Sequence, residues 1–200
     1  MADRGRPRGF DRDVALRRAM EVFWELGYDG ASMSDLTAAM GINSPSLYAA
    51  FGDKEALFRA AVELYRHTEG SYTARALREQ PTAYAAIEAM LRDNITHYTD
   101  PGLPNGCMVV LAGATYTTRN AAVREFLVEA RRHTTADIRA RLDRGVTDGD
   151  LSPDTDTASL AMLYSTVLYG LSIQARDGVS PGELSAAVDS ALCTLEAVTR

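Results

Sequence analysis

The sequence predicts an all-α protein, in which a small N-terminal head of three helices with a helix-turn-helix joins a larger helical body. Three observations support this fold class. Apolar residues recur at helical spacing through most of the 200 residues, and no segment alternates like a β-strand. Two very short helical stretches also meet at a glycine turn within residues 32–54. With 46% hydrophobic residues, the chain can bury a sizeable core.

The first two helices follow from apolar spacing and capping. An apolar stripe over about residues 11–26 predicts a first helix that forms the floor of the head, and Gly27 is expected to end it. Ser32 and Asp35 fit a capping box, in which side chains satisfy the free N–H groups of a new helix. A second helix is therefore expected over residues 33–40.

The third helix begins after a sharp turn. Gly41 can adopt the left-handed conformation that ends a helix, and Ile42 is expected to pin the turn against the core. Ser44 suits the capping position and Pro45 the first position of a helix over residues 45–50. Such a short helix buries little, so we expect it to present side chains to the major groove of DNA. A tight helical corner packed against a neighbour is the alternative.

The outward residues of this third helix suit contact with DNA. Small side chains let the backbone approach base edges, while a tyrosine hydroxyl and a lysine suit phosphate oxygens. The candidates are Ser44, Ser46, Tyr48, Ala49, Ala50 and Lys54. A flexible arginine arm ahead of the head is expected to follow the minor groove or phosphates, because a helix-turn-helix motif lies behind it; a solvated terminus is the alternative. Its residues are Arg4, Arg6 and Arg8.

The rest of the chain also reads as helices. Asp53 can cap a fourth helix that could continue to Arg78 and joins the head to the body. A loop rich in turn formers is expected over 100–106. Further helices are expected over about 82–98, 107–117, 121–144, 156–176 and 181–198. The last two carry wide apolar stripes, which could pack on the chain's own core or on a second copy.

Composition limits the function. The net charge of −6 would ordinarily argue against a nucleic-acid partner, and only the local arginines offset it. The sequence shows no metal-ligand spacing, phosphate-binding loop or nucleophile elbow, so we expect no metal, no cofactor and no catalysis. Two cysteines without a signal peptide, and no run of membrane-spanning length, point to the cytoplasm.

A small-molecule pocket is expected inside the body. Residues that mix apolar surface with hydroxyls or a ring nitrogen are typical of such sites, although core packing alone could explain each of them. The candidates are Tyr98, Met108, Leu111, Tyr116, Phe126, His133, Tyr164 and Tyr169. Cys107 lies at the expected start of a helix, which favours a reactive thiol. An inert small apolar residue is the alternative.

The segments GRPRGFD, ALRRAMEVFWELGYDGAS and DLTAAMGINSPSLYAAFGDKEALF, together with the overall length, resemble a TetR/AcrR-family transcriptional regulator. The resemblance is specific over roughly the first 65 residues. It implies a homodimeric helical repressor that leaves a palindromic operator in double-stranded DNA when a small-molecule effector binds. The implied division is a DNA-binding domain over 1–52 and a ligand-binding and dimerisation domain over 53–200.

The resemblance also implies residue roles. The DNA contacts would be Ser34, Ser44, Pro45, Ser46, Tyr48, Ala49 and Lys54. At Ala49 and Ala50 the chain departs from the aromatic or charged residues often found there, which leaves the operator sequence open. The implied dimer interface includes Leu163, Val167, Leu171, Leu184, Val188 and Leu195. The alternative function is a helical ligand-binding or protein-interaction module without specific DNA binding, and a small helical enzyme comes third.

Overall fold

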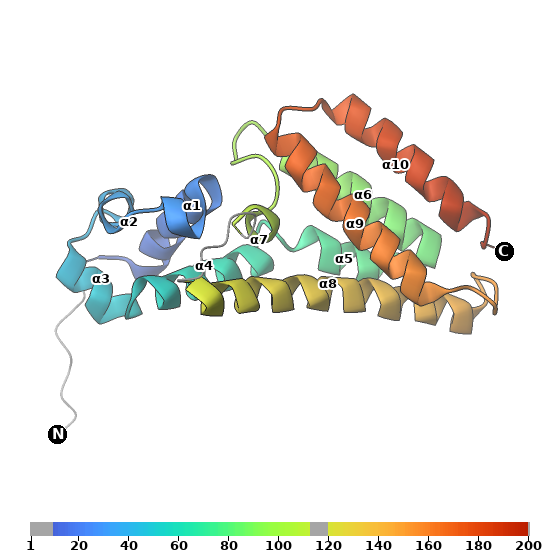
Figure 1. The fold of residues 1–200 in the computed structure, drawn as a ribbon, viewed down its shortest axis with the longest axis horizontal. Helices are drawn as coiled ribbons and strands as arrows, with labels where there is room; N and C mark the ends of the chain where they lie inside the picture. The colour runs from blue at the N-terminus through green and yellow to red at the C-terminus, as the bar shows by residue number, and fades with distance from the viewer. Residues whose placement is uncertain (1–9, 113–119, 200) are drawn as a thin grey trace, which may run out of the picture.

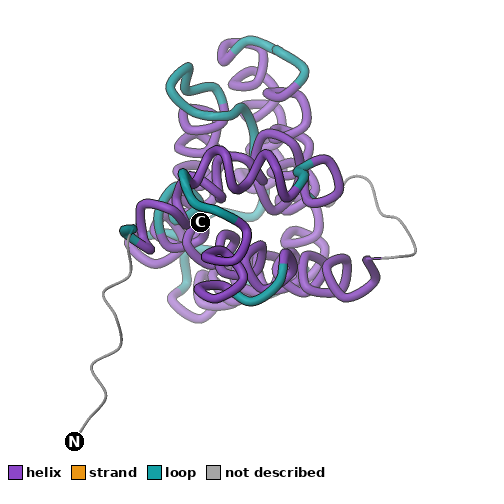
Figure 2. Tube along the Cα trace, turned by 90° about the vertical axis from the view of Figure 1, so that its left-hand side faces the viewer, coloured by secondary structure: helices purple, strands orange, loops and turns teal. Residues whose placement is uncertain are grey.

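The computed structural model describes residues 10–112 and 120–199, and this part of the chain is helical almost throughout (Figures 1 and 2). An isolated bridge pairs Leu151 with Thr199, and the described residues form no strand. The predicted all-α class is confirmed. The helices are α1 (Arg12–Gly30), α2 (Met33–Met40), α3 (Ser44–Phe51), α4 (Lys54–His67), α5 (Tyr72–Glu79), α6 (Ala83–Tyr98), α7 (Met108–Leu111), α8 (Ala121–Asp148), α9 (Thr157–Arg176) and α10 (Pro181–Glu196).

Helices α1, α2, α3 and the first half of α4 form the head, at the left of Figure 1. Aromatic rings fill its core, where Phe23 meets Phe58 edge-on with ring centroids 5.0 Å apart. Gly27 ends the regular part of α1 as predicted, because its backbone angles, φ 71° and ψ 175°, are not helical. A short helical segment follows the kink and extends α1 to Gly30. The chain changes direction there because glycine adopts this positive φ at no steric cost.

The predicted fourth helix is two helices in the structure. Helix α4 ends at His67 and α5 begins at Tyr72. Between them the N–H of Gly70 donates to the carbonyl of Tyr65 at 2.7 Å. A Cβ at Gly70 would lie 2.6 Å from the Tyr65 ring, so the close approach requires glycine. The prediction of one helix to Arg78 was wrong because this contact is not visible in helical periodicity.

Helix α8 joins the head to the far end of the body (Figure 1). Its N-terminal residues Val123 and Leu127 belong to the same hydrophobic cluster as the head. Ile138 and Leu142, further along, belong to the cluster formed with α6, α9 and α10. The helix ends at Asp148 with Gly149 in the left-handed conformation, four residues beyond the predicted end.

The predicted sixth helix is only partly described. Helix α7 spans Met108–Leu111 and is capped by Ala112. Residues 113–119 lie outside the described part of the chain, and so does the pocket candidate Tyr116. The arm residues Arg4, Arg6 and Arg8 lie outside it as well.

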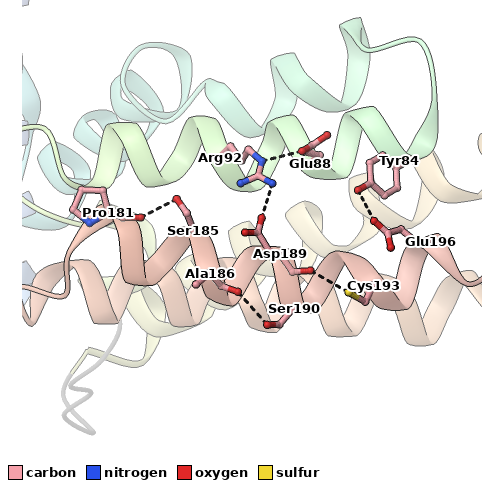
Figure 3. Close-up of polar contacts among 10 residues, drawn as sticks. All are labelled: Tyr84, Glu88, Arg92, Pro181, Ser185, Ala186, Asp189, Ser190, Cys193 and Glu196. Atoms are coloured by element: carbon pink, nitrogen blue, oxygen red, sulfur yellow. Dashed lines mark hydrogen bonds and ion pairs between the residues drawn. The ribbon is translucent and has the colours of Figure 1, made fainter.

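Helix α10 packs against α6 of its own chain (Figure 3). Arg92 of α6 binds Glu88 at 2.9 Å and Asp189 of α10 at 2.7 Å, and the Tyr84 hydroxyl donates to Glu196 at 3.1 Å. The predicted interface residues Leu171, Leu184, Val188 and Leu195 are all buried in this core. They are therefore not free to contact a second copy, and the prediction for these four is corrected.

Helix α9 is long and apolar enough to cross a membrane by length and composition, with a mean hydropathy of 1.2 over its most apolar window. The expectation that no run approaches that length was therefore wrong. In the structure, Leu160, Tyr164, Leu168 and Leu171 of α9 lie in the core of the body, so the helix has the apolar composition of a packed core helix.

Candidate nucleic-acid interface and ligand cavity

The helix-turn-helix geometry is present in α2 and α3. Ser32 and Asp35 form the predicted capping box of α2, and these hydrogen bonds from Ser32 hold the pKa of Asp35 below its ordinary value. Gly41 takes the left-handed conformation at φ 68°, and Ile42 packs partly buried against the head core. The turn therefore directs α3 outward, as a recognition helix requires.

The two faces of α3 differ as predicted from its sequence. Leu47 and Phe51 are buried in the head, whereas Tyr48 remains 50% exposed. The other predicted contact residues are exposed or partly buried: Ser34, Ser44, Pro45, Ser46 and Ala49. The structure thus brings small side chains and one tyrosine hydroxyl together on one face, which suits close approach to base edges and phosphates.

Asn43, rather than Ser44, caps α3. Its Oδ1 accepts the N–H of Ser46 at 2.9 Å, and Ser44 is the first helical residue. Asparagine and serine are about equally good caps, so the sequence alone did not distinguish the two positions. The correction places Asn43 at the exposed start of the recognition helix, where it joins the candidate contact residues.

The described chain begins beside this helix. Phe10, the first described residue, lines the same surface depression as Asn43, Ser46 and Ala49, next to the proposed DNA-binding face. Arg18 reaches the turn, with Nη1 3.5 Å from the position of a Cβ at Gly41. This places a cation from α1 beside the interface despite the acidic balance of the chain.

Lys54 is less free than its sequence position suggested. Its Nζ lies 4.5 Å from the centroid of the Tyr28 ring, and the side chain is partly buried at the start of α4. Burial lowers its pKa, an effect that nearby Asp29 opposes. The cation–π contact fixes the Lys54 ammonium at the start of α4, beside the recognition helix α3 that precedes α4 in the chain.

A cavity of about 670 Å³ lies in the body between α4, α5, α6, α8 and α9. Of the predicted pocket residues, Tyr98, Cys107 and Tyr169 line it. Its polar wall comes from α5, α6 and α8, with residues that the sequence analysis did not single out: Thr73, Asn94, Arg131, Thr134 and Asp137. The volume of the cavity and its lining of both apolar and polar residues are typical of a small-molecule site.

The other predicted pocket residues do not line this cavity. Met108 is buried in the cluster shared with the head, and Leu111 lies beside Gly106. The Phe126 ring lies under the guanidinium of Arg59, and exposed His133 sits next to Glu129. Tyr164 packs in the core, where its hydroxyl donates to the Ala191 carbonyl at 3.2 Å and burial raises its pKa to about 12.

Two buried phenols, Tyr65 and Tyr98, and the thiol of Cys107 line the cavity together. Burial raises the pKa of Tyr65 and of Tyr98 well above the usual value, and neighbouring Cys107 contributes to both shifts. Both phenols therefore stay protonated at neutral pH and can donate hydrogen bonds. Cys107 is a free cysteine at the N-cap of α7, and its backbone N–H donates to Ser172 Oγ at 2.8 Å.

Comparison with known proteins assigns the part of the chain that holds each site to a known kind of domain. Residues 15–61 match the bacterial regulatory proteins of the tetR family, and residues 83–189 match the tetracyclin repressor-like C-terminal domain. This chain belongs to the tetR family. It is a DNA-binding transcriptional regulator with an N-terminal helix-turn-helix and a larger helical C-terminal domain.

Similar tetR-family proteins span nearly the whole chain. The transcriptional repressor ComR of Escherichia coli K12 is 31% identical, over 88% of this chain and 85% of ComR. The repressor BdcR of the same strain is 32% identical, over 91% and 87%. A cysteine variant of the regulator CifR, solved with 26-bp operator DNA, is 49% identical with a TM-score of 0.91, over 94% of this chain and 98% of CifR.

Among the described residues of the body, α9 exposes large apolar side chains on its outward side. Met162 is 61% exposed on α9, Leu163 36% and Ile173 46%. Val167 and Gly170 lie between them and are partly buried. Of the predicted interface residues, Leu163 and Val167 thus face outward. Leu171 continues the same four-residue spacing, but each step of four residues turns about 40° around the helix axis, so Leu171 faces the core while Leu163 does not.

Proposed function

We propose that this tetR-family chain is a homodimeric repressor that binds a palindromic operator through α3 and leaves it when a small molecule fills the body cavity. Helix α4 is the observation that carries this mechanism. Its first residue, Lys54, lies beside the recognition helix, and Tyr65, Arg66 and His67 at its other end line the cavity. Fourteen helical residues span roughly 20 Å, so one rigid element reaches both sites.

The proposed dimer interface is the outward face of α9. One eight-residue recognition helix makes too few contacts for specific binding, whereas a two-fold pair can read two half-sites one DNA turn apart. The exposed apolar residues Met162, Leu163 and Ile173 give this face the character of an unpaired surface. We place the interface at these residues with Val167 and Gly170.

The roles of the two parts of the chain follow the proposed mechanism. We assign DNA binding to residues 1–52, and ligand binding and dimerisation to residues 53–200. The similar proteins are transcriptional regulators, which supports a regulatory rather than catalytic role for the cavity. Since its target is chromosomal DNA, the proposed site of action is the bacterial cytoplasm.

Operator binding can be tested with purified protein and genomic fragments at two salt concentrations. Specific binding survives salt that abolishes non-specific binding, so enriched fragments identify the operator. Tyr48→Phe should weaken binding to all operator variants alike, whereas Ser46→Ala should change the preference among them. Tyr84→Phe, on α6 far from the head, is the matched control. If both head variants bind every fragment as the wild type does, α3 does not read DNA.

Effector release is tested by reciprocity. A ligand releases DNA only if it binds better to a conformation that misplaces the recognition helices, so operator DNA must weaken ligand binding by the same factor. A compound library screened for operator release supplies the ligand, and calorimetry with and without operator measures its affinity. Asn94→Leu, at the buried polar wall of the cavity, should weaken ligand binding. Equal ligand affinity in both states would refute the mechanism.

Chemical modification of Cys107 is a second candidate trigger, favoured by the position of this thiol on the cavity wall against two phenols. An oxidant or electrophile that reaches the cavity would react there rather than bind reversibly. Cys107→Ser should then abolish release by mild peroxide and keep release by an inert ligand. Cys193→Ser, at the exposed cysteine of α10, is the control.

A further inference from the structure

The loop between α6 and α7 lies between the head and the dimerisation helix. On the head side, Trp24 Nε1 donates to the carbonyl of Gly106 at 3.0 Å, and this contact is buried. Arg176, the last residue of α9, reaches across to the end of α1. Its Nη2 donates to the backbone carbonyl of Glu25 at 2.5 Å, and its Nη1 lies 3.1 Å from Glu25 Oε2. Head and body are thus linked by these contacts in addition to helix α4, whose Tyr65 ring meets Trp24 edge-on with ring centroids 4.9 Å apart.

The same loop is fastened to α9 on its other side. The side chain of Asn105 donates to the Ala175 carbonyl at 3.4 Å, and Nη1 of Arg176 lies 3.5 Å from the Asn105 carbonyl. Gly106 has φ +79°, and a Cβ there would lie 2.5 Å from the carbonyl oxygen of Ser172. Only glycine permits this approach, so the loop backbone packs closely between α1 and α9.

We propose that Arg176 is a positioning residue for operator binding, which holds the head at a fixed orientation to the dimerisation helix α9. We name the contacts of Trp24, Glu25, Asn105, Gly106 and Arg176 the head clamp. This inference rests on the proposed function and adds a connection between α1 and α9 to the one that α4 makes. Because α9 forms the proposed interface, a clamp at its end sets the separation of the two recognition helices, which must match successive turns of DNA.

The head sits on the body much as it does in a relative bound to operator DNA. Over 94% of the chain, head and body together, the structure superposes on CifR solved with operator DNA at a TM-score of 0.91. Such agreement across both parts requires a similar placement of the head on the body. The clamp contacts therefore stabilise the arrangement in which a relative is found on its operator.

The cavity adjoins the clamp directly. Tyr98 at the end of α6 and Cys107 at the start of α7 line the cavity, and they flank the loop at its two ends. A ligand that displaces either residue moves Gly106 relative to Trp24. Occupation of the cavity can then loosen the head through the loop as well as through α4, provided that the ligand prefers the loosened state.

The test replaces the clamp arginine and compares it with an arginine that joins two helices inside the body. Arg176→Gln removes the charged contacts to α1, whereas Arg92→Gln removes the equivalent contacts between α6 and α10 (Figure 3). Fluorescence anisotropy with an operator fragment selected by the wild type measures affinity. We expect Arg176→Gln to weaken binding about tenfold, a size typical of coupling between sites, and Arg92→Gln to leave it within about twofold.

The only tryptophan of the chain supplies a second readout without DNA. Trp24 is 1% exposed at the clamp, so its emission should shift to the red in Arg176→Gln and not in Arg92→Gln. Glu25→Gln should lie between wild type and Arg176→Gln, because the backbone carbonyl still accepts from Arg176. Light scattering and thermal unfolding establish that the variants remain folded dimers.

Three binding results would overturn the proposal: Arg176→Gln binds the operator as the wild type does, loses affinity only as much as Arg92→Gln, or binds more tightly. In the last case the clamp stabilises the released state. A wild type that binds no fragment specifically would instead contradict the proposed function. The tryptophan emission of the DNA-free variants then still decides whether Arg176 holds the head, and an unshifted emission refutes the clamp.

Discussion

Replacing Gly170 by leucine tests where two copies of the chain associate. Gly170 lies on the outward face of α9, seven residues after Leu163, and a Cβ there would meet no heavy atom within 4 Å. Within one chain the change is favourable, because leucine is a better helix former than glycine by about 1 kcal/mol. The isolated subunit should therefore unfold at an equal or higher temperature.

In the dimer the same change should be costly. If Gly170 faces the partner's helix, the added side chain overpacks the interface at about 1–3 kcal/mol, and two-fold symmetry applies this cost twice. The total of roughly 2–6 kcal/mol corresponds to association weakened by about 30-fold to more than 10⁴-fold. Operator affinity should fall with it, since the paired half-sites need the dimer.

Sedimentation velocity over a range of protein concentrations measures this association, and calorimetry measures the stability. Gly182→Leu is the matched control, because a Cβ at Gly182 also meets open space but lies in the first turn of α10. The control should keep the wild-type mass. An unchanged dissociation constant for Gly170→Leu would place the interface elsewhere and refute the reasoning.

Three further predictions concern the core and the head. Val188→Asp puts a carboxylate at a fully buried position and should lower the free energy of unfolding by more than about 4 kcal/mol in a urea titration, with loss of fold rather than clean separation into monomers. Asn43→Ala removes the cap of α3 and should cost about 1 kcal/mol of stability together with weaker operator binding, whereas Ser44→Ala should leave stability nearly unchanged. The folded-state pKa of Asp35 is depressed. Its capping contribution to stability is therefore present above the ordinary pKa and disappears as the pH falls through the lowered value. The difference in unfolding free energy between wild type and Asp35→Asn should shrink on acidification and persist at neutral pH.

Features set by short-range chemistry could be predicted from the sequence. The capping boxes at Ser32 and Ser180 depend on a side chain three residues away, and both are present. The left-handed Gly41 and the buried Leu47 likewise follow from local pattern. These features define the helix-turn-helix, which is why fold class and family followed from the first 65 residues.

Features that depend on distant contacts could not be predicted. Gly70 breaks the fourth helix through its approach to Tyr65, and an apolar stripe does not reveal whether Val188 packs on α6 or on a second chain. Which residues line the cavity also depends on distant contacts. Tyr164 and Tyr169 lie on one helix five residues apart, about 140° around its axis, and only Tyr169 reaches the cavity. A count of tyrosines cannot separate them.

Helix α9 explains why dimerisation, folding and head orientation are open to separate tests in one short chain. Its inward residues, such as Leu168 and Leu171, belong to the body core, so their loss unfolds the chain. On its outward side, a Cβ at Gly170 would meet no heavy atom of the described chain within 4 Å, so a change there should affect association rather than folding. Of the α9 residues named here, Arg176 at the end of the helix is the one that contacts the head. These roles lie on different sides and at different positions of α9. A variant that alters stability, association or head orientation while the other two stay constant therefore identifies which surface of α9 transmits the effector signal to the head.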